Sequence, residues 1–261
     1  MSKKISFFLC VSVPGKKLFW MKLSIIIPTL NEESLIEKNL ASIRKQLLAI
    51  GNELSAEIIV ADGGSRDRTV ETARRFADRV CISDKGRGEQ MNAGAKVSEG
   101  DLLLFLHADS ILYLSGIVNM LKVMEDNNIV GGAFRLKIDS PTPMYRCWGK
   151  IAFKIISSAA NMRSRILGIA YGDQGIFVRR NIFYAVGGYP DISIMEDVEF
   201  VKRLKGKGKF IILNECVTTS SRRWDREGIL YTTIRNWILI SLYLIGASPN
   251  RLKGWYREHG G

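Results

Sequence analysis

The stretch SIIIPTLNEE, residues 24–33, determines the fold class that we predict for this chain of 261 residues. Residues 25–27 are three isoleucines, and a run of apolar, β-branched residues favours a buried strand. Pro28 cannot donate a hydrogen bond to a neighbouring strand, so we expect the strand to end there. Asn31 can cap a following helix, and Glu32 favours the positive end of its dipole. The chain is therefore predicted to pass from a sheet into a helix through a short polar loop, where ligands bind in open α/β sheets.

The same alternation of strand and helix patterns recurs through the first half of the chain. Strand patterns at 56–62, 79–83 and 101–109 are separated by helix patterns at 70–77 and 88–98. The last of these strands, DLLLFLHAD, is apolar almost throughout, which is typical of a strand that is covered on both faces. A β-α-β-α series predicts an α/β fold with a doubly wound, mostly parallel sheet and helices on both faces.

The second half is less regular and ends in an apolar helix pattern. Residues 228–246 carry one charge, Arg235, and the uncharged stretch 236–249 is shorter than the roughly twenty residues that span a bilayer. We expect three regions. Residues 1–20 form a dispensable or flexible extension, 21–228 form the α/β domain, and 229–261 form a C-terminal apolar helix and tail.

Composition and charge limit the classes of partner. A hydrophobic content of 46% suits one globular domain with a large core. A net charge of +12 suits an anionic partner such as a nucleotide, a nucleic acid or an acidic membrane face. The sequence has no zinc-finger or RNA-binding signature, so we expect no nucleic-acid partner. Four cysteines without a CxxC pair predict neither a zinc site nor a disulfide framework, and indicate a reducing, cytoplasmic location.

Four polar loops follow the four predicted strands, and together they predict a nucleotide site. Glycines in two of them permit close backbone approach, and the third loop opens a helix whose N-terminus attracts anions. The sequence has neither a dinucleotide fingerprint nor a phosphate loop of the type G-x-x-x-x-G-K-S/T. The acidic residue of the second loop, Asp62, can accept hydrogen bonds from a base or cap the next helix. The loops are 28–32, 62–65, 86–92 and 107–109.

The fourth loop predicts a metal site. A carboxylate at the end of an apolar strand is costly to bury unless it is paired or bound to a metal. Asp109 can bind Mg²⁺ or Mn²⁺ while a diphosphate supplies further oxygens. His107 lies two residues earlier, so both side chains would face the same side of an extended strand. His107 is either a ligand, an orienting group or a packed core residue.

Five motifs in order resemble the family 2 glycosyltransferases of the GT-A fold. They are SIIIPTLNEE, IIVADGGSRDRTVETA, GRGEQMNAGA, GDLLLFLHAD and GGY…MEDVEFVKRL, and the resemblance covers residues 22–245. Within the family, the chain is similar to a small bacterial subgroup, the radical-SAM/selenodomain-associated transferases 2. The resemblance implies a nucleotide-sugar donor, most often a UDP-sugar, a bound Mn²⁺ or Mg²⁺ ion, and inversion at the anomeric carbon.

The resemblance also implies roles for individual residues. Asp109 matches the last aspartate of the family's D-x-D metal motif, and His107 stands where the first aspartate is usual. The pair Glu196-Asp197 matches an acidic pair in which the aspartate is the base for the acceptor hydroxyl, and Glu196 is assigned as its support. A purely local alternative is that both stabilise a helix N-terminus. The residues expected around the nucleotide are Pro28, Thr29, Glu32, Asp62, Gly64, Arg87 and Gln90.

Two further motifs are candidates for substrate contact. In YGDQG, Asp173 and Gln174 are expected to meet the donor sugar or the acceptor. In SSRRW, Arg222, Arg223 and Trp224 are expected to close over the diphosphate, because arginine makes bidentate contacts to phosphate. The alternative for the second motif is a solvated basic loop.

Other functions and partners stay open. A sugar-nucleotide pyrophosphorylase uses related substrates, although the first strand is not followed by a Gly-rich loop bearing Arg and Lys. A non-catalytic nucleotide- or membrane-binding protein is a second alternative, given His107 in the metal motif. The acceptor is unknown and can be lipid-linked. The C-terminal helix is either a core or homodimer helix, or an interfacial helix at the inner membrane face.

Overall fold

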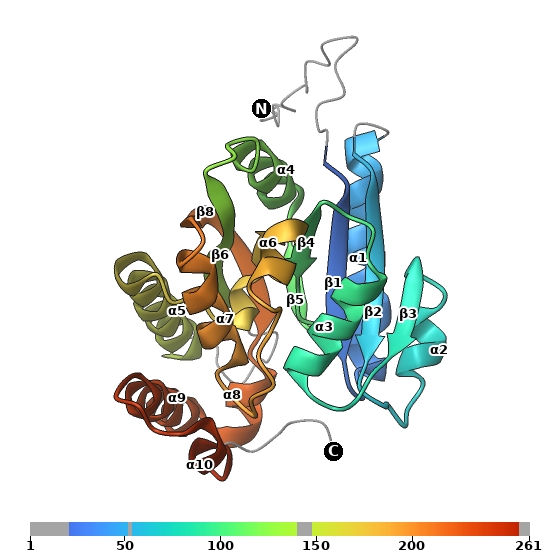
Figure 1. Ribbon diagram of the computed structural model, residues 1–261. Helices are drawn as coiled ribbons and strands as arrows, with labels where there is room; N and C mark the ends of the chain where they lie inside the picture. Colours follow the sequence, from blue (N-terminus) through green and yellow to red (C-terminus); the bar gives the residue numbers. More distant parts are fainter. Residues whose placement is uncertain (1–20, 52–53, 140–147, 256–261) are drawn as a thin grey trace, which may run out of the picture.

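The computed structural model describes residues 21–51, 54–139 and 148–255. The sequence pattern of residues 144–167 predicts an amphipathic helix, and its first residues, like the predicted N-terminal extension, lie outside these ranges. Within them, a central sheet runs through the molecule and helices lie against both of its faces (Figure 1). The strand order is β3-β2-β1-β4-β7-β6-β8-β5.

The first half forms the predicted parallel β-α-β-α series. Each helix returns the chain so that the next strand pairs in parallel with an earlier one. Thr29, the last residue of β1, stands opposite Asp62, the last residue of β2, so the polar loops leave the sheet at the same edge. The elements are β1 (Leu23–Thr29), α1 (Glu33–Ile50), β2 (Ala56–Asp62), α2 (Thr69–Ala73), β3 (Arg79–Ile82), α3 (Arg87–Val97) and β4 (Leu102–Phe105).

Both faces of this sheet are buried, as the apolar strands predicted. In β1, Ile25 and Ile27 belong to the core on the face covered by α1, whereas Ile26 packs with α3 on the other face. β4 repeats the alternation, with Leu104 on the first face and Phe105 on the second. Side chains alternate sides along a strand, so a continuous apolar run is needed to fill both cores.

The second half departs from the parallel pattern. β7 (Ile176–Arg179) runs antiparallel to both β4 and β6 (Ile129–Asp139), and β5 (Ser110–Leu112) runs antiparallel to β8 (Lys209–Ser220). Four of the seven strand pairings in the described residues are therefore parallel and three are antiparallel. The glycines of VGGAF explain one close pairing, because a Cβ at Gly131 would overlap the carbonyl oxygen of Phe177.

The remaining helices surround this half of the sheet. α7 (Glu196–Lys205) carries Phe200 into the core shared with α3, and three helices follow β8 in the described residues. The helices are α4 (Leu114–Val123), α5 (Trp148–Leu167), the 3₁₀ turn η3 (Gly172–Gln174), α6 (Arg180–Ala185), α7 (Glu196–Lys205), α8 (Arg222–Glu227), α9 (Ile229–Leu244) and α10 (Pro249–Lys253). None of the helices in the described ranges has the length and apolar character needed to cross a membrane.

Candidate active site

The first two loops are joined to each other by hydrogen bonds. Asp62 is fully buried, and its carboxylate accepts from the Thr29 hydroxyl at 2.9 Å, from the Ser65 hydroxyl at 2.6 Å and from two backbone N–H groups of the same turn. The expectation that Asn31 caps α1 is wrong. Glu32 is the N-cap residue, and the Asn31 Oδ1 atom accepts from the Arg66 N–H at 2.9 Å. Asp62 thus shapes the loops from inside, and Gly64 has the positive φ of 88° that this turn requires.

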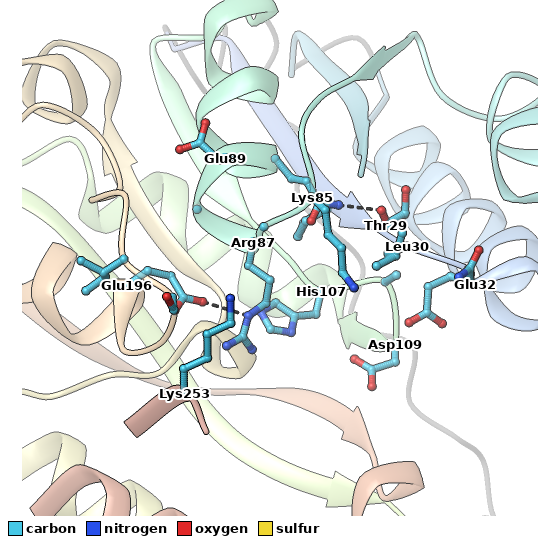
Figure 2. Close-up of a pocket in the computed structure, with 18 of the residues that line it drawn as sticks. Thr29, Leu30, Glu32, Lys85, Arg87, Glu89, His107, Asp109, Glu196 and Lys253 are labelled. Carbon is cyan, nitrogen blue, oxygen red and sulfur yellow. Dashed lines mark hydrogen bonds and ion pairs between the residues drawn. The ribbon is translucent and has the colours of Figure 1, made fainter. Parts of the chain in front are cut away.

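Gln90 connects these loops to the third one. Its Nε2 atom donates to the carbonyl of Thr29 at 2.6 Å and to that of Ala61 at 3.1 Å, so one buried amide joins the ends of β1 and β2. Gln90 lies in the first turn of α3, whose first residue, Arg87, points into the space below the loops (Figure 2).

The fourth loop leaves the sheet earlier than the sequence pattern predicted. β4 ends at Phe105, and His107 to Asp109 form a turn in which the Ser110 N–H donates to the carbonyl of His107 at 3.0 Å. Asp109 has long contacts, 3.4 Å from the hydroxyls of Ser110 and Thr219 and 3.5 Å from Arg222. The turn, rather than the alternation of an extended strand, brings His107 and Asp109 to the same cavity.

Arg222 connects the fourth loop to the first. Its guanidinium donates to both carboxylate oxygens of Glu32, at 2.9 and 3.2 Å, and approaches Asp109. Burial raises the pKa of Glu32, and the Arg222 charge opposes that rise. Two segments 190 residues apart in the chain therefore meet at the fourth loop.

The acidic pair at the start of α7 divides between two environments. Glu196 is buried and accepts from the Arg87 Nε atom at 2.8 Å, and burial raises its pKa. The Asp197 Oδ2 atom accepts from the Gly172 N–H at 2.7 Å. The preceding residue, Met195, has a left-handed φ of 66°, and such strain at a non-glycine residue is frequent at functional sites.

These loops enclose two cavities that share a wall. The large cavity has a volume of about 610 Å³ and is bounded by the first, third and fourth loops and by Glu196. The small cavity, about 130 Å³, contains Asp173 and Asp197. Figure 2 shows Arg87 between Glu196 and His107, with Asp109 and Glu32 on the far side of His107. The shared wall consists of Arg87, His107, Asp109 and Arg223.

Burial sets the charge on the histidine of this wall. The pKa of His107 falls to about 4, first because of burial and then because of the nearby Arg87 charge. The imidazole is therefore neutral near pH 7, which is the form that can donate a lone pair to a metal ion. Its Nε2 atom lies close to Gly172, and a Cβ at that position would come within 2.7 Å of it.

A family model described as "Glycosyl transferase family 2" matches residues 24–187, which is more than half of the chain. The chain belongs to glycosyl transferase family 2. The relationship predicted from the five motifs is confirmed, whereas the radical-SAM-associated subgroup stays a prediction. The family region extends from β1 to α6, and α7, β8, α8, α9 and α10 follow it.

Curated relatives agree with this assignment. The PGL/p-HBAD biosynthesis glycosyltransferase of Mycobacterium bovis (strain BCG / Pasteur 1173P2) is 30% identical over 177 residues, which cover 64% of this chain and 62% of the relative. The O-antigen chain rhamnosyltransferase of Salmonella typhimurium is 27% identical over 78% of this chain and 68% of its own length. The chain thus spans about three fifths of the length of the mycobacterial relative.

Solved structures share the fold. Glucosyl-3-phosphoglycerate synthase from Mycobacterium tuberculosis, in complex with Mn²⁺, UDP and phosphoglyceric acid, gives a TM-score of 0.58 at 17% identity over 87% of this chain and 79% of that one. A mannosyltransferase from Pyrobaculum calidifontis, in complex with GDP-Man and Mn²⁺, gives 0.55 at 19% identity over 76% and 56% of the two chains. The predicted GT-A fold is confirmed by these likenesses.

The predicted site residues occupy three kinds of position. Gln174 faces away from both cavities, since its amide donates to the carbonyl of Phe134 at 3.0 Å and accepts from the Ser164 hydroxyl at 2.9 Å. Asp62 and Gly64 shape the loops and are not among the residues that bound the cavities. Trp224 packs edge-on against Phe153 of α5 and borders the small cavity. The others border a cavity: Pro28, Thr29, Glu32, Arg87, Gln90, His107, Asp109, Asp173, Glu196, Asp197, Arg222 and Arg223.

The donor set of the shared wall is compatible with a divalent cation. Among the described residues no group of three or more His, Cys, Asp and Glu side chains can hold a metal ion by itself. Asp109 and His107 nevertheless supply one carboxylate, whose present contacts are long, and one neutral imidazole. Both are ligands that Mn²⁺ accepts, and a bound diphosphate would complete the coordination with its oxygens.

Several residues of the site were not predicted. Lys85, Lys253 and Asn250 border the large cavity, and Asn236 and Leu239 of α9 border the small one. The last four lie on α9 and α10, whose return to the cavities depends on packing and leaves no local signal in the sequence.

Two unpredicted residues support Asp173. The Arg163 guanidinium stacks on the Tyr171 ring at 3.6 Å from its centroid, and both lie beside Asp173. Arg163 is half-buried on α5 and is not among the buried residues of that helix, so no local sequence signal identifies it.

We expect Asp173→Asn to stabilise the protein in a pH-dependent way. Burial raises the pKa of Asp173 to about 6, and the Oδ1 atom has no hydrogen-bond partner among the described residues. A raised carboxyl pKa means that stability is lost as pH rises from about 4 to about 6, by about 1–3 kcal/mol. As pH rises through this interval, the melting temperature of the variant should therefore rise relative to that of the wild type, and the difference should persist at higher pH. Calorimetry in a pH series measures this difference.

The matched control for this prediction is Asp84→Asn, at an exposed position. Its melting temperature should follow the wild type at every pH. A gain in Asp173→Asn that is the same at pH 4 and pH 7 would refute the buried-carboxylate explanation.

Proposed function

We propose that this chain transfers a sugar from a nucleoside diphosphate sugar to an acceptor hydroxyl and inverts the configuration at the anomeric carbon. Among such donors, we propose a UDP-sugar. The observation that carries the proposal is the shared wall. A large cavity edged with cationic side chains adjoins a small cavity that contains carboxylates, and Arg87, His107, Asp109 and Arg223 separate them. Sugar transfer needs this arrangement, because the leaving diphosphate and the acceptor lie on opposite sides of the anomeric carbon.

The large cavity suits the donor. Its loops offer backbone groups and Pro28, Thr29 and Glu32 to a base and ribose. Basic side chains oppose the charge that develops on the leaving diphosphate, which is an electrostatic contribution to catalysis. The cationic residues that border the cavity are Lys85, Arg87, Arg222, Arg223, Arg226 and Lys253.

Asp109 and His107 are the residues that would hold Mn²⁺ or Mg²⁺. The ion would supply Lewis-acid charge next to the diphosphate. Solved relatives of the fold contain Mn²⁺ with UDP or GDP-Man. The Arg222 guanidinium lies 3.5 Å from Asp109, so its positive charge can keep a diphosphate close to the shared wall.

The small cavity suits the acceptor. The Asp197 carboxylate, held by the Gly172 N–H at 2.7 Å, accepts the proton of the acceptor hydroxyl as its oxygen bonds to the anomeric carbon. The bond from that carbon to the diphosphate oxygen breaks, and the nucleoside diphosphate leaves with the electron pair, through an oxocarbenium-like state. Glu196 keeps Arg87 in place at 2.8 Å, and Arg87 faces both cavities.

We also propose the limits of the catalytic region and the location of the protein in the cell. We assign catalysis to residues 21–228 with help from the segment 229–261, because α9 and α10 contribute to the cavities. A cytoplasmic location would give access to nucleotide sugars. A sugar-nucleotide pyrophosphorylase and a non-catalytic binding protein are the competing functions.

A thermal-shift screen with UDP-, GDP-, ADP- and dTDP-sugars, each with and without Mn²⁺, tests the donor assignment. A ligand at a hundred times its dissociation constant stabilises the native state by about 2.7 kcal/mol. For a chain of this size that corresponds to a rise of about 5–10 °C in melting temperature. We expect one donor to give this rise with Mn²⁺, and Asp109→Asn to reduce the part that depends on Mn²⁺.

Asp84→Asn is again the control and should keep the full Mn²⁺-dependent rise, since Asp84 is exposed and borders neither cavity. Two results would contradict the proposal. One is that no nucleotide sugar raises the melting temperature, either with or without Mn²⁺. The other is net synthesis of nucleotide sugar from sugar phosphate and nucleoside triphosphate, which would favour the pyrophosphorylase.

A further inference from the structure

One side of α9 exposes a continuous apolar stripe. Leu230 is 77% exposed and Ile245 is 80% exposed, which is far more than soluble surfaces usually allow for such side chains in a row. The spacing of one, four, seven, eight, fourteen and fifteen residues from the first position places them on one helical face. The stripe consists of Leu230, Tyr231, Ile234, Trp237, Ile238, Leu244 and Ile245.

The one charged residue of α9 points away from this stripe. The Arg235 side chain is 5% exposed, and its guanidinium lies 2.7 Å from the Glu227 carboxylate inside the molecule. The Thr232 hydroxyl donates to the same carboxylate at 3.2 Å. The outer face of α9 thus carries no charge, whereas 25% of the residues of the whole chain are charged.

α5 exposes a second stripe of the same kind. Trp148 is 84% exposed, and Ile151, Ile155, Met162 and Ile166 follow at helical spacing. The two helices meet at one small core, in which Phe153 of α5 clusters with Trp224, and Ile229 of α9 packs against this cluster. Figure 1 shows α5 and α9 on the same side of the molecule, away from β3.

The charged residues of the two segments that carry the stripes have one sign. Residues 148–167 and 229–255 contain seven basic residues and no aspartate or glutamate. Two copies of this face would bring like charges together, which disfavours a homodimer, whereas an anionic surface complements them. Five of the seven are exposed, namely Lys150, Lys154, Arg165, Arg251 and Lys253, whereas Arg235 is buried against Glu227 and Arg163 is half-buried against Tyr171.

We propose that the stripes of α5 and α9 form a docking face for an anionic phospholipid bilayer. Apolar side chains with tryptophans, flanked by basic residues, are the features of helices that lie in the membrane interface. Trp148, Trp237 and Trp255 are exposed on these segments, and tryptophan favours the head-group level of a bilayer. The helices lie on the bilayer and do not cross it.

The docking face has a consequence for the acceptor, which rests on the proposed function. The inner side of α9 supplies Asn236 and Leu239 to the small cavity, and the outer side carries the stripe. One helix therefore separates the bilayer from the cavity of Asp197 by its own thickness. The acceptor class that fits is an amphiphile, with its hydroxyl-bearing head in the small cavity and its apolar anchor in the bilayer.

Vesicle co-sedimentation of the full chain tests the docking face. Vesicles of phosphatidylcholine with about a third phosphatidylglycerol should bind the protein, and phosphatidylcholine alone should bind it more weakly. The double variant Ile234→Glu/Ile238→Glu should reduce partitioning into anionic vesicles by about tenfold or more, because it adds two charges to the stripe. Ile151→Glu/Ile155→Glu, on α5, should reduce it as well.

The matched control is Leu48→Glu/Ile82→Glu, which makes the same charge change at exposed apolar positions on α1 and β3. It should bind vesicles like the wild type. The proposal is overturned if the wild type stays in the supernatant, if the control and the α9 variant lose binding equally, or if sedimentation velocity shows a dimer that the α9 variant abolishes. Melting curves confirm that each variant is folded, and the donor screen with Mn²⁺ reports on the proposed function independently of vesicles.

Discussion

Replacing Asp197 by asparagine is expected to lower turnover by about 10²–10⁴-fold with donor affinity unchanged. An amide has nearly the shape of the carboxylate, and its oxygen can still accept from the Gly172 N–H, which lies 2.7 Å from Asp197 Oδ2. It cannot take the proton of an acceptor hydroxyl at neutral pH. Steady-state turnover and calorimetric titration of the donor measure the two quantities separately.

The comparison with two other aspartates makes this test specific. Asp84→Asn, at an exposed position outside the cavities, should keep wild-type turnover. Asp173 shares the small cavity with Asp197, so Asp173→Asn shows which carboxylate is the base. Full turnover in Asp197→Asn, or a larger loss in Asp173→Asn, would reject the assignment of Asp197.

Replacing Arg235 by methionine is expected to lower the free energy of unfolding by about 3–5 kcal/mol. The Arg235 and Glu227 side chains are 5% and 9% exposed and lie 2.7 Å apart. Without the guanidinium, the buried Glu227 carboxylate would lose the positive charge that lies 2.7 Å from it. Urea denaturation at neutral pH, with the slope compared between variants, measures the loss.

A double variant and a surface control separate the charge effect from lost packing. Arg235→Met/Glu227→Gln should recover most of the stability, because it removes both charges. As the surface control, Lys202→Met removes an ion pair in which the Lys202 Nζ atom lies 3.9 Å from the Glu199 carboxylate. It should lower the free energy of unfolding by less than about 1 kcal/mol. If the double variant is no more stable than Arg235→Met, the loss comes from packing and the buried ion pair does not hold α9 to α8.

The first half of the fold could be predicted from local patterns. Ile25 to Ile27 and the apolar run of β4 are buried on both faces, which periodicity alone indicates, and Pro28 lies one residue before the end of β1. The order of the polar loops then follows from parallel topology, since every strand of a β-α-β series ends at the same edge. These features depend on residues that are neighbours in sequence.

The antiparallel half could not be predicted in the same way. β7 enters between β4 and β6, and β5 pairs with β8 over a separation of more than a hundred residues. Such pairings depend on which hydrophobic faces fit together, and a strand pattern does not state its partner. For the same reason, α10 could not be placed beside the large cavity.

Within the site, the sequence alone determined the chemical types and tertiary structure decided their use. Polar loops after apolar strands identified Asp109 and His107 as candidates, because charged groups at such positions need a partner or a function, and the family resemblance implied the role of Asp197. Only the fold turned the Asp62 carboxylate into its own loop, pointed Gln174 into the interior and brought Asp197 to a small cavity beside Asp109. The physical reason is that residue type limits what a side chain can do, whereas burial and distance to remote groups arise from packing between segments far apart in the chain.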